Sequence, residues 1–142
     1  MIKNIRHTGI VVKDLEKSLN FYRDMLGFQI SKQMEETGNC LEAILALKGV
    51  KVTTVKMVAP DKQMIELLQY HSHIKKEELR EICDIGISHI ALTVSDLDSE
   101  YETLRKTGIS FNAPPQISDD GHVKVTFCRA PEGTFIELVE VL

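Results

Sequence analysis

The chain has 142 residues, of which 43% are hydrophobic, enough to build the core of one domain of ordinary size. Its formal charge is −4, from 17 basic and 21 acidic residues that are interspersed along the sequence. Because no block of one sign would hold nucleic acid or an anionic membrane, we expect neither as a partner.

The cysteines and the N-terminal residues indicate in which cellular compartment the protein is found. Cys40, Cys83 and Cys128 are odd in number and widely spaced, with no CxxC pair, which predicts neither a disulfide framework nor a zinc knuckle. The N-terminal residues pass directly into a strand-like alternation, and no apolar run approaches the roughly 20 residues of a membrane span. We therefore expect a cytoplasmic protein with no targeting segment.

In chain order, the first half begins with a strand over residues 5–12, rich in β-branched side chains. Asp14 then stands as the N-cap of a helix that ends near Gly27. The apolar residues of that helix recur at helical spacing: Leu15, Leu19, Tyr22 and Leu26. Three further strands are expected over residues 28–34, 50–58 and 64–70, with a short extra helix over residues 40–47.

The second half repeats this order. Residues 87–97 echo residues 5–15 at an offset of 82, and residues 130–139 echo residues 59–68 at an offset of 71. The strand 87–94 is followed by a helix from the N-cap Asp96 to Gly108, and the remaining strands are expected over residues 109–112, 122–129 and 134–141. The chain thus reads as two βαβββ modules in one cooperative domain, module 1 over about 1–70 and module 2 over about 86–142. The polar linker, about 71–85, could hold a helix over residues 74–82.

Four polar residues interrupt apolar strands at equivalent positions of the two modules. They are His7 and Glu66 in the first and His89 and Glu137 in the second. Strand side chains alternate between faces, so all four should lie on the face of the sheet away from the helices. An unpaired carboxylate in a core-facing strand is costly, and a metal ion would remove that cost. Two imidazoles and two carboxylates suit zinc, nickel, cobalt, iron or manganese, with a position left for substrate.

Other candidates carry less weight. His71 and His73 fall in the polar linker and are expected to be solvated, and His122 is expected to begin a strand. Possible substrate contacts without a strong warrant are Glu42, Arg23 and Arg129.

The segment from His7 to Phe28, HTGIVVKDLEKSLNFYRDMLGF, resembles the opening of vicinal-oxygen-chelate superfamily proteins, and residues 130–140, APEGTFIELVE, resemble their closing motif. The resemblance spans essentially the whole chain. It implies an α+β fold in which two tandem βαβββ modules form a cupped eight-stranded mixed sheet. The family's metal-ligand positions fall on His7, Glu66, His89 and Glu137.

The resemblance also implies an activity. Glyoxalase I uses this His/Glu/His/Glu set and moves a proton through a metal-chelated enediolate, so a lyase or isomerase of that type is the expected function, with Glu137 and Glu66 as candidate bases. A methylmalonyl-CoA epimerase-like racemase is the alternative enzyme, although those proteins often have Gln where this chain has Glu66. A metal-free, small-molecule or antibiotic-binding protein of the same fold is the non-enzyme alternative. Many relatives are homodimers, which we expect here too.

Overall fold

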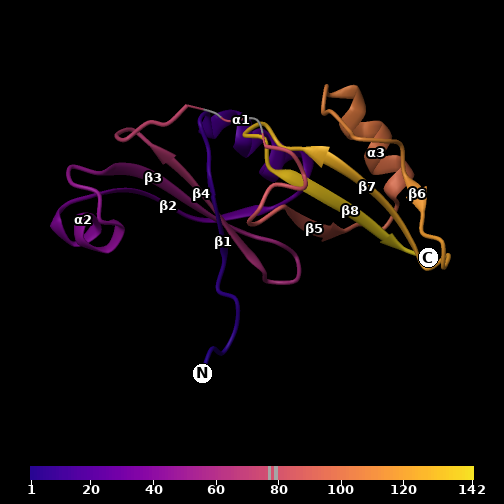
Figure 1. Cartoon of the computed structure of the whole chain (residues 1–142), viewed down its shortest axis with the longest axis horizontal. Helices are drawn as coiled ribbons and strands as arrows, with labels where there is room; N and C mark the ends of the chain where they lie inside the picture. Colours follow the sequence, from indigo (N-terminus) through magenta and orange to yellow (C-terminus); the bar gives the residue numbers. More distant parts are fainter. Residues whose placement is uncertain (77, 79) are drawn as a thin grey trace. The chain divides into compact units, whose positions relative to one another are not determined.

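The computed structural model describes residues 1–76, 78 and 80–142. Two compact units divide the chain, Met1–Glu77 and Glu78–Leu142, and each is built around one four-stranded sheet. The order strand, helix, strand, strand, strand occurs in both (Figure 1), so the predicted α+β class with two βαβββ modules is confirmed. That the two modules form one cooperative domain stays a prediction.

Module 1 contains a mixed sheet with the strand order β1-β4-β3-β2, in which only the β1–β4 pair is parallel. Its elements are β1 (Thr8–Val11), α1 (Leu15–Leu19), which continues as the π-helix η1 (Asn20–Met25), β2 (Gln29–Thr37), α2 (Asn39–Leu45), β3 (Lys51–Val58) and β4 (Met64–Tyr70). The extra helix expected over residues 40–47 is α2.

Module 2 repeats the topology with the strand order β5-β8-β7-β6, and here only β5 and β8 run parallel. Its elements are β5 (His89–Thr93), α3 (Leu97–Lys106), β6 (Gln116–Ile117), β7 (Val123–Arg129) and β8 (Phe135–Val141).

Both long helices begin at the predicted caps. The Asp14 carboxylate accepts a hydrogen bond from the amide of Lys17 (3.1 Å), and the Asp96 carboxylate accepts one from the amide of Ser99 (2.9 Å). Each cap satisfies an amide that has no partner within its helix. Fixed in this way, each helix returns over one face of its own sheet.

That covered face holds the core of each module. In β4 the side chains of Ile65 and Leu67 are buried, as are those of Ile136 and Leu138 in β8. The helix of module 1 adds Phe21 and Tyr22, whose rings meet edge to face. Burial of this apolar surface is the main term that holds each helix on its sheet. The opposite face of each sheet, which we call the open face, carries the even-numbered residues of β3 and β4 and the odd-numbered residues of β7 and β8.

Two predicted elements differ from the structure. The strand expected over residues 109–112 is reduced to a single bridge between Phe111 and Cys128. The regular pairing of β6 begins only after Pro114 and Pro115, because proline has no amide to donate to a ladder.

The second predicted element that differs from the structure is the helix expected over residues 74–82. Residues 74–76, 78 and 80–82 are not helical, and Glu77 and Leu79 lie outside the described residues. Ile74 is 75% exposed, so a helix here would have little apolar surface to bury, and a helix this short is marginal without packing.

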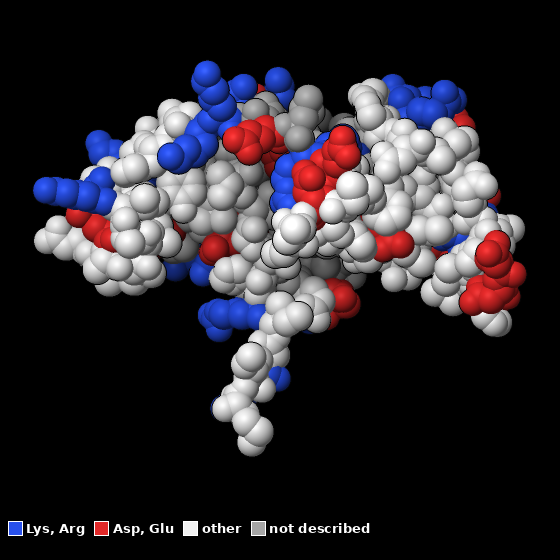
Figure 2. Space-filling model, viewed as in Figure 1, with Lys and Arg blue, Asp and Glu red and all other residues white. Residues whose placement is uncertain are grey.

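The surface agrees with the interspersed charges of the sequence. Figure 2 shows acidic and basic side chains mixed over the face drawn, without a large area of one sign. Within the described part of the chain, no helix combines the length and apolarity needed to cross a membrane.

Candidate metal-binding half-sites

The first His–Glu pair lies at the start of β1. His7 precedes that strand by one residue, and the parallel pairing of β1 with β4 sets Gly9 opposite Glu66. This register brings His7 Nε2 to 3.3 Å from Glu66 Oε2. The Glu66 side chain is only 13% exposed, so its carboxylate is largely removed from water and depends on partners for compensation.

The second pair reproduces this geometry. His89 is the first residue of β5, and the parallel register with β8 sets it opposite Phe135 and Ala91 opposite Glu137. His89 Nε2 lies 3.2 Å from Glu137 Oε2, and the Glu137 side chain is 23% exposed. The structure therefore brings the four predicted ligands together as two matched pairs, one on the open face of each module.

Each pair has the spacing of two ligands of one metal. Donor atoms bound at about 2.1 Å and subtending 90–109° at the ion lie roughly 3.0–3.4 Å apart, the range found in both pairs. In residues 1–76, 78 and 80–142, no group of three or more His, Cys, Asp or Glu side chains is placed to hold a metal ion. Each pair is therefore a half-site that supplies one nitrogen and one oxygen donor.

The second ring nitrogen differs between the two histidines. His89 Nδ1 lies 2.6 Å from the hydroxyl oxygen of Ser88, the kind of outer partner that fixes the tautomer of a metal-binding imidazole. His7 Nδ1 is buried and has no hydrogen-bond partner among the described residues. In both modules the nitrogen and oxygen donors fit a divalent metal. Among the described residues, only the histidine of module 2 has a hydrogen-bond partner at its second ring nitrogen.

The residue beside the glutamate also differs, and the sequence analysis missed it. Lys56 of β3 pairs in register with Glu66, and its Nζ lies 3.6 Å from Glu66 Oε1. In module 2 the register partner of Glu137 is Phe127, whose ring meets the His89 ring edge to face at 5.2 Å. The repeat offset of 71, which relates Glu66 to Glu137, also relates Lys56 to Phe127. Comparing the two modules at this offset would have shown that a lysine in one corresponds to a phenylalanine in the other.

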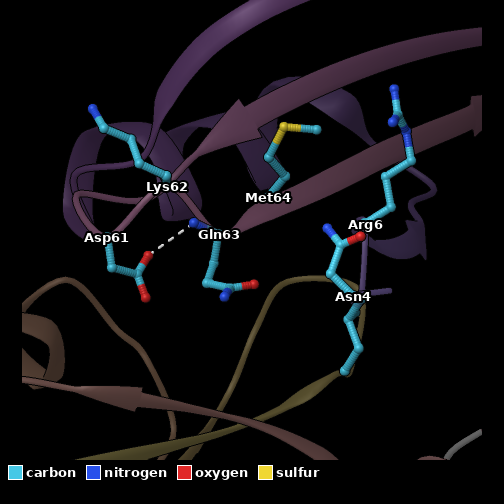
Figure 3. A pocket seen from close by; sticks show the side chains of 7 residues that line it. Asn4, Arg6, Asp61, Lys62, Gln63 and Met64 are labelled. Carbon is cyan, nitrogen blue, oxygen red and sulfur yellow. Dashed lines mark hydrogen bonds between the residues drawn. The ribbon is translucent and has the colours of Figure 1, made fainter. Parts of the chain in front are cut away.

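The cavity found in module 1 lies beside the half-site, not over it. Its volume is about 520 Å³, and Figure 3 shows it between the residues before β1 and the β3–β4 turn. Its lining is Asn4, Ile5, Arg6, Asp61, Lys62, Gln63 and Met64. None of the four predicted ligands is part of that lining.

The weaker candidates have contacts of their own or lie in another element. Arg23 donates two hydrogen bonds to Asp24, each 2.7 Å, and this interaction lowers the pKa of the Asp24 carboxyl. Arg129 lies over the Phe135 ring, 4.0 Å from its centre, and donates to the carbonyl of Arg80. Glu42 lies in α2.

The three remaining histidines behave as expected. His71 and His73 are exposed, with Thr53 and Ser72 as their respective partners. His122 immediately precedes β7, consistent with the expectation that it begins a strand.

Comparison with known proteins identifies what this arrangement resembles. The family model of the Glyoxalase/Bleomycin resistance protein/Dioxygenase superfamily matches residues 4–138. The chain is 31% identical to the probable lactoylglutathione lyase of Synechocystis over 134 residues, which cover 94% of this chain and 92% of that protein. It is 28% identical to the uncharacterized protein YwbC of Bacillus subtilis over 141 residues, or 99% of each chain.

A solved structure shows the same fold. The glyoxalase family protein from Bacillus cereus superposes with a TM-score of 0.91 at 22% identity, over 100% of this chain and 96% of that one. These matches confirm the resemblance found in residues 7–28 and 130–140.

Proposed function

Because the chain belongs to the glyoxalase/bleomycin resistance/dioxygenase superfamily, we propose that it is a metal-dependent lyase or isomerase of the glyoxalase I type. The observation that carries the proposal is the pair of matched half-sites, His7–Glu66 and His89–Glu137, at 3.3 and 3.2 Å. Neither pair belongs to the apolar core of β4 and β8, whose buried side chains lie on the opposite face of each sheet. Their recurrence in both modules points to a shared function.

We assign all four side chains to one divalent metal, nickel, cobalt, zinc, iron or manganese, with one half-site from each module. The two modules can belong to one chain or to the two chains of a homodimer. When bound, the metal would supply Lewis-acid stabilisation of negative charge on neighbouring oxygens of the substrate. A homodimer in the cytoplasm is part of the same proposal, in line with the absence of a disulfide pattern among the three cysteines.

The protein's own contribution is proton transfer. Glu137 is the first candidate for the base, because His89 is its one ion-pair partner among the described residues, whereas Glu66 is held by both His7 and Lys56. A carboxylate placed beside the substrate can remove a proton next to a carbonyl and return it at the neighbouring carbon. The matching relative that is a probable lactoylglutathione lyase supports this class of reaction.

The test is the turnover of Glu137→Gln with the metal-loaded protein. We expect the wild type to isomerise the hemithioacetal of methylglyoxal and glutathione, and the variant to lose about 10²–10⁴-fold in kcat, the usual contribution of a general base. Glu132→Gln, on the β7–β8 turn, is the matched control and should retain activity. Circular dichroism would establish that the variants remain folded.

Two outcomes would contradict the proposal. Near-full activity of Glu137→Gln would exclude Glu137 as the base. A wild type that takes up no metal would favour a metal-free binding protein of the same fold.

A further inference from the structure

Lys56 places a positive charge directly beside the first half-site. Its Nζ lies 3.6 Å from Glu66 Oε1, while the other carboxylate oxygen of Glu66 faces His7. The Lys56 side chain is 28% exposed, so its charge is partly withdrawn from water. Such a position is costly unless an anion compensates it.

A second lysine lies on the same face. The register of β2 with β3 sets Lys32 directly opposite Lys56, and cross-strand partners share one face of a sheet. Like charges opposite each other destabilise a strand pair. Lys32 makes no ion pair with any of the residues that the structure describes, so this unfavourable pairing is not relieved within the module.

The carboxylates of Glu36 and Glu66 lie on the same face as the two lysines. Glu36, also on this face, accepts a hydrogen bond of 2.6 Å from the hydroxyl of Thr54. Glu66 is shared between His7 and Lys56, and a metal at the half-site would draw on the same carboxylate. With Glu66 bound to a metal, the charge of Glu36 alone would face the two lysines, so one positive charge on this face would lack a counter-charge.

Module 2 shows that a lysine is not needed to hold a His–Glu pair. Phe127 occupies the position equivalent to Lys56, and His89 and Glu137 still lie 3.2 Å apart. The half-sites are therefore matched in their ligands and different in their neighbours, a cation in module 1 and an aromatic ring in module 2. The Lys56 cation is therefore not required by the His–Glu geometry, which leaves it available for a group of the substrate.

We propose that Lys56, assisted by Lys32, binds an anionic group of the substrate, which is an α-hydroxycarbonyl compound bearing a carboxylate or phosphate. The inference rests on the proposed function, since it places the charged group beside the proposed metal ligands. It deepens that function by naming Lys56 as the residue that selects for charge. Charge-assisted hydrogen bonds from an ammonium group to carboxylate or phosphate oxygens supply the affinity.

The test compares three probes by calorimetry on metal-loaded protein of known metal content. Dihydroxyacetone phosphate and hydroxypyruvate carry vicinal oxygens with a phosphate and a carboxylate respectively, and dihydroxyacetone is the neutral counterpart. We expect the wild type to bind at least one anionic probe about tenfold more tightly than the neutral one, as a hydrogen bond to a charged group allows. The anionic probe that binds more tightly shows whether the site prefers a phosphate or a carboxylate.

Variants assign that preference to the residue. Lys56→Gln should abolish the preference for the anionic probe while metal content is unchanged. Lys56→Arg, which keeps the positive charge, should retain the preference. Lys51→Gln, which removes the same charge from an exposed position on the other face of β3, should leave it intact.

Every outcome is decisive. Equal binding of charged and neutral probes by metal-loaded wild type, no binding of either anionic probe, or an undiminished preference in Lys56→Gln would overturn the inference and leave the proposed function standing. A preference that depends on Lys56 in a protein that takes up no metal would support the anion site and overturn the proposed function.

Discussion

Lys62 occupies a backbone position that the second module gives to glycine. Its φ is 74°, in the left-handed region, and the residue related by the offset of 71 is Gly133, with φ 91°. The two turns are otherwise alike, because the amide of Lys62 donates to the carbonyl of Ala59 (3.0 Å) and that of Gly133 to the carbonyl of Ala130 (2.9 Å). A side chain in this region costs roughly 1–2 kcal/mol. The first turn therefore holds strain that the second avoids.

Lys62→Gly should relieve that strain. Glycine loses more conformational freedom on folding, which offsets roughly 0.5–1 kcal/mol, so the expected net gain in the free energy of unfolding is about 0.5 kcal/mol. Urea denaturation measures it. Lys62→Ala, which keeps a Cβ in the same backbone conformation, is the control and should show no gain. A loss of stability in the glycine variant would mean that the lysine side chain contributes more than the strain costs.

At the scale of elements, a strand residue ties down the N-terminus of each long helix. The amide of Leu15 donates to Gln69 Oε1 of β4 (3.0 Å), and the amide of Leu97 donates to Glu140 Oε2 of β8 (2.9 Å). Offsets of 82 and 71 relate these residues, so the contact is part of the repeated unit. It adds to the caps Asp14 and Asp96 and docks each helix onto its own sheet.

Module 1 predicts how a substitution in module 2 will behave. Because Gln69 makes the contact with an amide oxygen, Glu140→Gln should preserve it, whereas Glu140→Ala leaves the Leu97 amide without that partner and should cost about 1–2 kcal/mol. Chemical denaturation of the two variants gives the comparison. Equal losses would show that the ion pair of Glu140 with Lys124, at 3.4 Å, matters more than the contact with the helix.

At the scale of the whole molecule, the proposed metal would couple two modules that each supply half of its ligands. A ligand that binds only the folded state stabilises it, by about 2.7 kcal/mol at a concentration 100 times its Kd. If both half-sites are required, a variant in either module removes the stabilisation of both.

Glu66→Ala and His89→Ala test that coupling. Each should lower metal affinity by more than roughly 100-fold, since even outer partners of metal ligands contribute 10–100-fold, and each should abolish the rise in Tm on adding metal. Metal analysis and thermal unfolding provide the two readouts, with Glu35→Ala, an exposed residue of β2, as the control. Full metal binding by either variant would contradict a shared site.

Much of this protein follows from its sequence alone. The alternation of strands, the helical spacing after Asp14 and Asp96 and the two repeat offsets determined the order of elements, the fold class and the two His–Glu pairs, because these signals are local or recur along the chain. Tertiary structure decided the rest. Lys56 next to Glu66, Phe127 next to His89, and Gln69 at the start of α1 all depend on which residues of different strands and helices meet. Periodicity assigns a side chain to a face, but only the register between paired strands assigns its neighbours on that face.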